Sequence, residues 1–380
     1  MKKVIRHVGL DVDSAAIAAA VAEPGGEIRS LGSIPYRDEA VRKLVKKLGP
    51  ASELRICYEA GPHGYRLYWL LTKLGVHCDV VAPTLIPTRA GDRVKTNRRD
   101  AEKLARSYRS GDLTPVWVPD EEHEALRDLV RAREAAKKDQ LRARHRLGKF
   151  LLRRGLRAGA GIRSWTKNHL LWLETLRFEH VAVQATFVDY LHEVKHAGQR
   201  IRVLEAAIDE TIAAAPASIR ALVTALQALR GIKSVSAATM AAEVGPPSRF
   251  PHPKQLMGYS GMVSSEHSTG LSVRRGAITK TGNAHLRRIM GQAAWSYQHR
   301  PSLSAELRRR QAGSSAEVRE ISWKAQQRLC SRFRRLSAKG KVRQKVVTAI
   351  ARELLGFVWA IGIQVEKETQ HPKQRHGRAA

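Results

Sequence analysis

The sequence predicts an α/β domain at the N-terminal end, then a long helical region and a mainly helical C-terminal domain. Over residues 1–115, apolar runs of strand length alternate with helical patterns. Helix-breaking residues are scarce from Glu121 to Pro216, and helical periodicity resumes afterwards. We expect domains at 1–115, 116–215 and 216–365, followed by a disordered tail at 366–380.

The chain is strongly basic. Its 380 residues include 67 Lys and Arg against 35 Asp and Glu, a formal net charge of +32, while 43% are hydrophobic. This composition can form a folded core and calls for a polyanionic partner. We find no apolar run long enough to span a bilayer, no signal peptide and no lipidation motif, so nucleic acid is favoured over a membrane. Three scattered cysteines (Cys57, Cys78 and Cys330) fit the reducing cytoplasm.

The N-terminal elements follow one another in a definite order. The predicted strands are 4–12, 15–22, 27–34, 54–58 and 76–81, and the predicted helices are 39–48, 65–74 and a third from Arg98. The first three strands have short connections and are expected to form an antiparallel meander. A meander followed by alternating helices and strands is the order of an RNase H-like, RuvC-like fold.

Acidic residues end two of these strands. Asp11 closes the first strand, Glu59 closes the fourth, and Asp100 lies in the first turn of the helix from Arg98. The first and fourth strands are neighbours in an RNase H-like sheet, so Asp11 and Glu59 are expected to lie together. Each acid alone has a structural explanation, such as an interaction of Asp100 with its own helix N-terminus. Together they predict a site for Mg²⁺, which prefers oxygen ligands.

The middle region carries an apolar stripe beside a basic face. The pattern fits a long helical hairpin with a solvated basic face, or a coiled-coil arm that grips nucleic acid. The net charge favours both together, with the apolar side against a partner helix and the basic side against phosphates. The candidate DNA- or RNA-binding residues here are Arg127, Arg131, Arg142, Arg144 and Arg146.

Two helices joined by a tight turn are predicted at 225–245. The turn at 231–233 gives a helix-hairpin-helix shape, whose backbone amides can hold a DNA phosphate without reading bases. Lys233 is the cationic candidate in this turn. Any helical hairpin can show the same pattern. The last helix, predicted at 342–363, is strongly apolar and is expected to close the domain.

Residues 261–288 combine serines, threonines and glycines with paired arginines in one apparent loop, which ends at a helix start at Gly282-Asn283. Hydroxyls, glycines that admit a close backbone and guanidiniums can hold a phosphodiester and attack it. A solvated polar loop is the plain alternative, against which the net charge of the chain argues. The cationic candidates here are Arg274, Arg275, Lys280, Arg287 and Arg288.

Four motifs together resemble the insertion-sequence-110 family of transposases. They are GLDVDS at 9–14, YEAGPHGY at 58–65, KTNRRDAEKLAR at 95–106 and the HSTG…ITKTGN…LRR block at 267–288. The resemblance covers nearly the whole chain. It implies a RuvC-like domain with a DEDD set of acids, followed by a serine-bearing transposase domain.

The resemblance implies a metal site for Mg²⁺ at Asp11, Glu59, position 97 and Asp100. Position 97 is Asn in this chain, so one carboxylate is replaced by an amide. An amide oxygen can ligate a cation but contributes no charge.

The same resemblance places the nucleophile at Ser268, with Ser264, Ser265 and Thr269 as neighbouring candidates. A serine hydroxyl needs a base, a metal or an oriented phosphate to attack, and the adjacent His267 only flanks it in sequence. The family also implies a non-coding bridge RNA that joins donor and target DNA. It further implies a homo-oligomer, either a dimer or a tetramer, whose active site is built from one chain or from several. The expected location is the bacterial cytoplasm, in association with the nucleoid.

The sequence therefore predicts a transposase that forms a transient serine–DNA phosphodiester with the help of Mg²⁺. Two other functions remain open. A RuvC-like hydrolytic nuclease would attack with metal-activated water and use the serine stretch only to position phosphate. A non-catalytic nucleic-acid-binding protein would keep the acids as structural residues, with Asn97 marking the lost activity.

Overall fold

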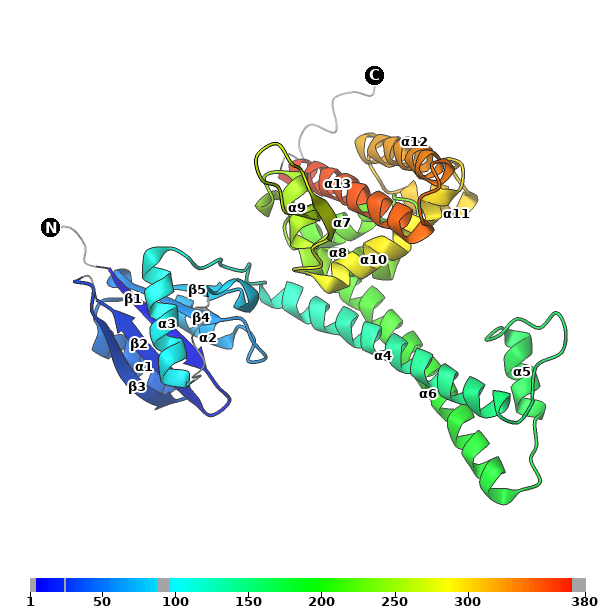
Figure 1. Ribbon diagram of the computed structural model, residues 1–380, viewed down its shortest axis with the longest axis horizontal. Coiled ribbons are helices and arrows are strands. Elements are labelled where there is room, and N and C mark those ends of the chain that lie inside the picture. The colour runs from blue at the N-terminus through cyan, green and yellow to red at the C-terminus, as the bar shows by residue number, and fades with distance from the viewer. Residues whose placement is uncertain (1–4, 24, 88–95, 371–380) are drawn as a thin grey trace. The chain divides into compact units, whose positions relative to one another are not determined.

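The computed structural model describes residues 5–23, 25–87 and 96–370 (Figure 1). The chain forms two compact units, residues 1–118 and 119–380. The helical region and the C-terminal domain, which we predicted separately, thus belong to one unit. Each unit is described below by itself.

The first unit is built on a five-stranded sheet with the strand order β3-β2-β1-β4-β5. Strands β1 (Arg6–Val12), β2 (Ala16–Ala22) and β3 (Ile28–Pro35) form an antiparallel meander. Strands β4 (Leu54–Glu59) and β5 (His77–Val81) continue the sheet parallel to β1. The predicted RNase H-like α/β fold is confirmed. The predicted strands are present within a residue or two, except that residue 4 lies outside the described ranges.

The two faces of the sheet are covered differently. Helices α1 (Asp38–Leu48) and α2 (Arg66–Lys73) belong to the face where large apolar side chains, such as Leu10, Ile56 and Leu71, form the core. Helix α3 (Asn97–Ser110) covers the other face, where alanines of β2 pack against alanines of α3. Gly9 of β1 lies under α3, and a Cβ there would come within 2.4 Å of the Ala101 carbonyl oxygen and the Ala105 nitrogen. Small side chains therefore hold α3 directly against the backbone of β1.

The second unit begins with a long helical hairpin. Helix α4 (Glu121–Leu152) packs along α6 (Val181–Ala214), and α5 (Lys167–Thr175) lies near the far end of the pair (Figure 1). The ion pairs Arg133–Glu205 and Arg200–Asp139 show that the two long helices run antiparallel. The apolar stripe thus packs against a partner helix within the same chain. At the far end of the hairpin, a second group of buried apolar side chains packs around Phe150.

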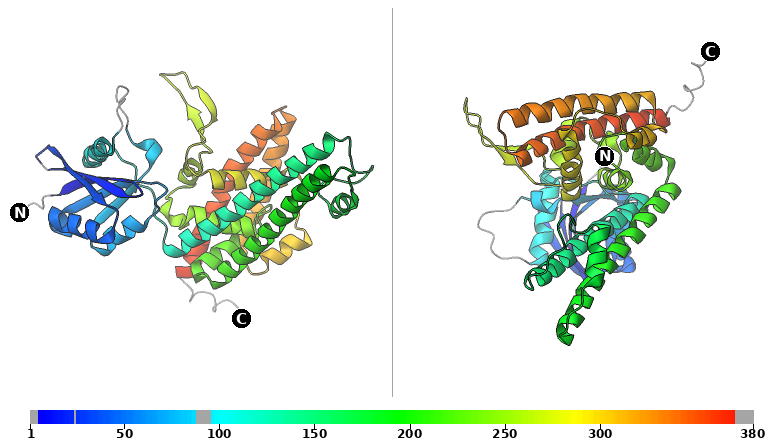
Figure 2. Two further views of the ribbon diagram at one scale, coloured as in Figure 1. Left: turned by 90° about the horizontal axis from the view of Figure 1, so that it is seen from below. Right: turned by 90° about the vertical axis from the view of Figure 1, so that its right-hand side faces the viewer.

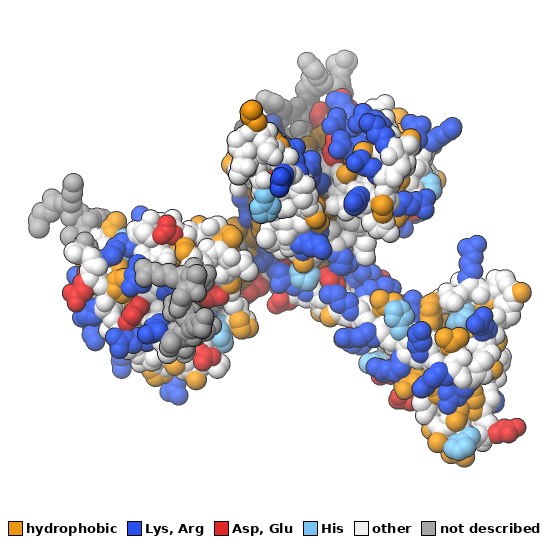
Figure 3. All heavy atoms as spheres, viewed as in Figure 1, with side chains coloured by type: hydrophobic (Ala, Val, Ile, Leu, Met, Phe, Trp, Pro, Cys, Tyr) orange, Lys and Arg blue, Asp and Glu red, His pale blue; other side chains and the backbone are white. Residues whose placement is uncertain are grey.

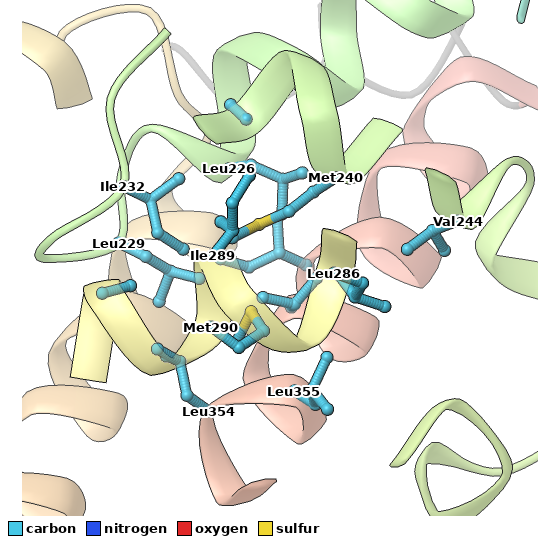
Figure 4. Close-up of a cluster of buried hydrophobic side chains, with 14 of the residues drawn as sticks. Leu226, Leu229, Ile232, Met240, Val244, Leu286, Ile289, Met290, Leu354 and Leu355 are labelled. Carbon is cyan, nitrogen blue, oxygen red and sulfur yellow. The ribbon is translucent and has the colours of Figure 1, made fainter. Parts of the chain in front are cut away.

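Seven further helices follow among the described residues, and all except Ala305–Gln311 contribute residues to the main core of this unit. Leu226, Met240, Leu286, Ile289 and Leu354 are among the residues that meet in it (Figure 4). The helices are α7 (Ala217–Leu226), α8 (Ser234–Val244), α9 (Pro253–Tyr259), α10 (Ala284–Ala294), α11 (Ala305–Gln311), α12 (Ala316–Ala338) and α13 (Arg343–Gln370).

Helices α7 and α8 form a pair in this region, but α7 ends at Leu226, close to where the predicted first helix begins, so the turn between them comprises residues 227–233 rather than 231–233. The turn is packed against the rest of the unit, because its carbonyl oxygens accept hydrogen bonds from Arg310, Gln311 and Ser322. The start of α8 has no side-chain cap, which leaves this helix end suited to an anion. Lys233 at that end is exposed but pairs with Glu306 at 2.8 Å. Phosphate binding by this turn stays a prediction.

Helix α13 corrects two expectations. It extends to Gln370, so residues 366–370 are helical rather than part of a disordered tail, and residues 371–380 lie outside the described ranges. It is also the one described helix long and apolar enough to cross a membrane, where we expected none. Its apolar side chains, including Ile350, Leu354 and Ile361, are buried in the core of the second unit. Its hydropathy is explained by this packing.

Two buried carboxylates join α4 to helices α8 and α10. Glu243 of α8 is fully buried and receives both nitrogens of the Arg131 fork, at 2.8 and 2.9 Å, and the amide of Asn283 at 2.7 Å. Burial alone would raise the pKa of Glu243, but these contacts and the charge of Arg127 lower it.

Glu134 of α4 is the second buried carboxylate. It pairs with His285 at 2.7 Å, Arg288 at 2.9 Å and Lys138 at 2.9 Å. Burial opposes ionisation here too, yet the hydrogen bonds from His285, Lys138 and Arg288 prevail and lower the pKa of Glu134 to about 2. Both carboxylates are therefore ionised at neutral pH and bind cations of the protein itself.

The substitution Gly9→Ala should destabilise the first unit. The new methyl group would meet the backbone of α3, which cannot move aside as a side chain can, and overpacking of this kind costs about 1–3 kcal/mol. Urea denaturation followed by circular dichroism would measure the change. Gly148→Ala is the control: no atom lies within 4 Å of its Cβ position, and alanine in a helix interior should stabilise by about 0.5–1 kcal/mol. Equal stability of Gly9→Ala and the native protein would contradict the close packing of α3.

The substitution Glu243→Ala should destabilise the second unit by about 3–5 kcal/mol, because it leaves Arg127 and Arg131 facing an uncompensated site. The same denaturation experiment measures it. Glu174→Ala, which breaks the exposed pair with Lys195, should cost at most about 1 kcal/mol. Similar costs for the two variants would show that Glu243 does not hold the unit together.

Candidate active site

The pleat of the sheet brings Asp11 and Glu59 to the same face. Gly9 and Cys57 are paired across β1 and β4, and both meet α3. Side chains two positions apart in a strand point to the same side, so Asp11 and Glu59 also face α3. They lie at the carboxyl ends of adjacent parallel strands, one position beyond the pair Leu10–Tyr58. The predicted juxtaposition of these two acids is therefore present in the sheet.

Helix α3 brings Asp100 to the same edge. Near its C-terminal end, Tyr108 meets the ring of His7 with centroids 5.4 Å apart, and one turn earlier Leu104 lies over Gly9. The helix therefore runs antiparallel to β1. One further turn toward its start places Asp100 at the level of Asp11, since four helical residues and two strand residues span about the same 6 Å.

The surroundings of these acids suit an oxygen-preferring cation. Asp11 and Asp100 are half-buried and Glu59 is exposed. The Oδ2 atom of Asp100 is buried and makes no hydrogen bond to any described residue. Such an orphaned oxygen is costly without a partner and fits a missing ligand or water. Within the described ranges, no three His, Cys, Asp or Glu side chains gather closely enough to hold a metal ion. The donors are suitable, but in this structure they do not close around a site.

Asn97 adds no negative charge to the three acids. It is exposed, at the first position of α3, and the helix is capped by Thr96, whose hydroxyl accepts from the Arg99 backbone nitrogen. The Asn97 amide is thus not used as the cap.

The stretch expected to be one loop is largely a β-hairpin. Strands β6 (Ser264–Glu266) and β7 (Arg275–Ile278) pair antiparallel, and the ladder continues past them. The His267 nitrogen donates to the Arg274 oxygen at 2.9 Å, and Thr269 and Ser272 exchange two backbone bonds of 3.1 and 3.0 Å. Backbone hydrogen bonds therefore order this polar segment, which projects from the body of the unit (Figure 2).

The hairpin register sets out the neighbours of Ser268. Glu266 is opposite Arg275 and Thr269 is opposite Ser272, so Ser268 is opposite Val273. Ser268, Glu266, Val273 and Arg275 therefore share one face, while Arg274 lies on the other with His267. Among the alternative nucleophiles, Ser265 is turned against Gly276 at the base of the hairpin.

Glu266 is a site residue that the sequence did not suggest to us. The exposed Ser268 hydroxyl donates to Glu266 Oε1 at 2.8 Å, and Arg275 Nε lies 3.3 Å from Oε2. The hydrogen bond from Ser268 and the adjacent Arg275 lower the pKa of Glu266, so its carboxylate is ionised at neutral pH. The signal was the i, i+2 spacing of Glu266 and Ser268, which becomes meaningful only once the segment is known to be a strand.

Both ends of the hairpin are fixed to the helical core. Thr279 and Lys280 donate backbone hydrogen bonds to Val263 and Gly261, at 2.9 and 3.0 Å, and so join the two ends to each other. The Gly261 and Met262 nitrogens in turn donate to carbonyl oxygens of α9, at 2.8 and 3.0 Å. Beyond Lys280, Asn283 caps α10 as predicted, and its backbone nitrogen bonds the Tyr259 oxygen at 2.8 Å.

Four of the arginines expected to bind DNA or RNA have hydrogen-bond partners within the protein. Arg127 is buried and donates to the Ala242 oxygen, while Arg131 forks onto Glu243. Arg287 donates to the Ser260 oxygen at 2.7 Å and Arg288 to Glu134. The carboxylates and carbonyls that hold them are buried, although Arg131 itself is exposed, and nucleic-acid binding by these four arginines stays a prediction.

Binding of DNA or RNA by the other candidate cations is likewise a prediction. Arg274, Arg275 and Lys280 are exposed on or beside the hairpin. Arg142 is exposed on α4 beside Asp139, and Lys233 lies at the start of α8. Farther along α4, the guanidiniums of Arg144 and Arg146 lie over the rings of Trp165 and Tyr190, at 5.1 and 5.7 Å from their centroids. Figure 3 shows Lys and Arg side chains along the long hairpin and in a dense group on the helical core.

Known protein families match both units. Residues 8–154 match the family described as Transposase (DEDD_Tnp_IS110), and residues 223–309 match the Transposase IS116/IS110/IS902 family. A relative from Sinorhizobium fredii (strain NBRC 101917 / NGR234), named "Putative transposase y4qE", is 46% identical over 95% of this chain and 90% of its own length. The transposase for insertion sequence element IS1533 of Leptospira borgpetersenii is 33% identical over 88% of this chain and 97% of its own length. This chain therefore belongs to the IS110 family of insertion-sequence transposases.

Proposed function

We propose that this transposase cuts and rejoins DNA through a covalent bond between Ser268 and a DNA phosphate. The observation that carries the proposal is the position of the Ser268 hydroxyl, exposed on an anchored hairpin and hydrogen-bonded to a carboxylate beside an arginine. A nucleophile, an acceptor for its proton and a cation for the phosphate thus share one face.

The proposed step is a displacement at phosphorus. The Ser268 Oγ–P bond forms as the bond from phosphorus to one deoxyribose oxygen breaks. The hydroxyl proton passes to Glu266, and the leaving oxygen takes up a proton to become a free DNA hydroxyl. One phosphodiester replaces another, so reversal on a new DNA end rejoins strands without an external energy source. Hydrolysis would lose that bond to water.

Glu266 and Arg275 have separate roles in this step, one toward the serine proton and the other toward the phosphate. The Glu266 carboxylate holds the hydroxyl hydrogen, so a lone pair of Oγ is free for the phosphate. Arg275 is mostly exposed, and it can turn a guanidinium nitrogen to a phosphate oxygen while it stays beside Glu266.

We further propose that Asp11, Glu59 and Asp100, with the Asn97 amide, hold Mg²⁺. When bound, the cation would neutralise charge on the scissile phosphate and its leaving oxygen. The support is the position of Asp11 and Glu59 on the sheet face that α3 covers, and the buried Oδ2 of Asp100 on that helix, which has no hydrogen bond to a described residue. These acids and Ser268 belong to different units, so the acids that serve a given serine can come from the same chain or from another copy in a dimer or tetramer.

The nucleic-acid partners proposed are donor DNA, target DNA and a non-coding bridge RNA. The net charge of +32 and the cations that remain exposed on the hairpin and on α4 support several phosphate backbones at once. The RNA rests on the family resemblance.

The first prediction here is that Ser268→Ala abolishes the covalent adduct and strand exchange while DNA affinity stays near the native value. Ser268 is exposed, so its removal leaves the fold intact. The measurement is digestion of a trapped complex and mass spectrometry of the peptide that carries the nucleotide. Ser264→Ala and Ser265→Ala are the matched controls and should retain the adduct.

Two outcomes would contradict this assignment. A nucleotide mapped to another residue would place the nucleophile elsewhere. Metal-dependent cleavage with free ends and no adduct, in the native chain, would identify a hydrolytic nuclease.

The second prediction concerns the metal. Asp100→Asn should weaken Mg²⁺ binding, measured by isothermal titration calorimetry, and should abolish cleavage without loss of DNA binding. Asn97→Asp should tighten Mg²⁺ binding, because it adds a ligand charge at the same edge. Glu102→Gln, on the same helix but paired with Arg98, is the control and should change neither. Unchanged Mg²⁺ affinity in both Asp100→Asn and Asn97→Asp would remove α3 from the metal site.

A further inference from the structure

The β-hairpin of residues 264–278, which carries Ser268 and is called the serine hairpin below, has an apolar and fully exposed tip. Leu271 has a relative exposure of 105%, the highest among the described large hydrophobic side chains, and Val273 has 62%. Apolar side chains at the outer end of this projecting hairpin are visible in Figure 3. An exposed apolar tip has a cost in water and so marks a contact. Nothing in the proposed serine chemistry uses it.

The backbone of the hairpin holds Leu271 at the tip. Gly270 and Leu271 are the two central residues of the turn closed by the reciprocal Thr269–Ser272 bonds. Gly270 has φ +54°, which suits a two-residue turn with glycine in the first central position. The side chain that follows this glycine points outward at the apex.

The charges around the tip indicate what it meets. Arg274 and Arg275 lie on the strand that follows Leu271, and Lys280 lies at the base of the hairpin, all three exposed. This arrangement, cations behind an apolar apex, matches duplex DNA, in which phosphates surround a stack of apolar base faces. Proteins that kink DNA insert leucine and similar side chains between base pairs in this way.

We propose that Leu271 is a wedge that enters the DNA base stack about two base-pair steps from the phosphate attacked by Ser268 and opens the step at that position. The proposal rests on the proposed function of Ser268. Ser268 lies about two strand spacings of 3.3 Å from the tip, about 7 Å, because the chain crosses between the strands from Gly270 to Leu271; this corresponds to about two base-pair steps of 3.4 Å. Val273, opposite Ser268 on the same face, would cover the sugar next to the attacked phosphate.

Opening a step there would serve the reaction. A stacked duplex holds the sugar–phosphate backbone in one conformation, while a kink at a nearby step relaxes the adjoining backbone and lets the attacked phosphate rotate, so that the leaving oxygen lies opposite the serine oxygen. The burial of Leu271 between bases offsets part of the cost of unstacking.

The first experiment measures unstacking without covalent chemistry. The full Ser268→Ala chain, purified without nuclease so that bound RNA stays in place, is mixed with a duplex spanning its element's junction. 2-Aminopurine is placed in turn at each position near the cleavage site. We expect a fluorescence rise of about fivefold or more at one position about two steps away, and its loss in Ser268→Ala/Leu271→Ser. Leu141→Ser, which removes an exposed leucine of α4, is the matched control and should keep the rise.

The second experiment tests rescue in chains that retain Ser268. Leu271→Ser should slow adduct formation on an intact duplex about tenfold or more, and a mismatched bubble at the opened step should restore the rate to within about twofold of native. Ser268→Ala should give no adduct on either substrate. The two ideas therefore fail separately: an adduct on another residue with Leu271-dependent fluorescence would refute the nucleophile and keep the wedge.

Three results would overturn the wedge. The first is a fluorescence rise that persists in Ser268→Ala/Leu271→Ser, or that is already absent in Ser268→Ala. Equal losses of rate on intact and mismatched duplex would mean that Leu271 only shapes the hairpin. A change in oligomeric state by light scattering in Leu271→Ser, with no fluorescence effect, would assign the tip to a second copy of the chain.

Discussion

The buried carboxylate of Glu243 fixes the position of the serine hairpin. The hairpin leaves the helical core after Tyr259 and returns to it at Asn283, and both of these residues bind Glu243. The Tyr259 hydroxyl donates to the Glu243 backbone oxygen at 3.0 Å, and the Asn283 amide donates to its carboxylate. Arg131 brings the long helix α4 to the same carboxylate. Both ends of the hairpin are therefore tied to one hydrogen-bonded network around Glu243 that lies outside the hairpin.

The sequence predicted the first unit well because its elements follow side-chain patterns. Alternation and strand-end acids gave the strands, the helix order and the meeting of Asp11 with Glu59. It failed at the hairpin, because main-chain hydrogen bonds rather than buried apolar residues order that segment. Glu266 was missed for the same reason.

The basic residues show a different limit of sequence reasoning. A count of charges cannot reveal which cations face a carboxylate far away in the chain. Arg131 and Glu243 are 112 positions apart, and Arg288 and Glu134 are 154 apart. Only the packing of α4 against α8 and α10 brings these partners together. Such arginines contribute to the net charge but are bound to partners within the protein.

The direction of α3 has an electrostatic consequence for the acidic edge. Because the helix runs antiparallel to β1, its N-terminal end, with the positive pole of its macrodipole, lies at the carboxyl ends of β1 and β4. That pole attracts the negative charges of Asp11 and Glu59 and so reduces their mutual repulsion in the metal-free protein. It also attracts a phosphate group. The N-terminal end of α3 thereby makes this acidic edge of the sheet more approachable for an anion.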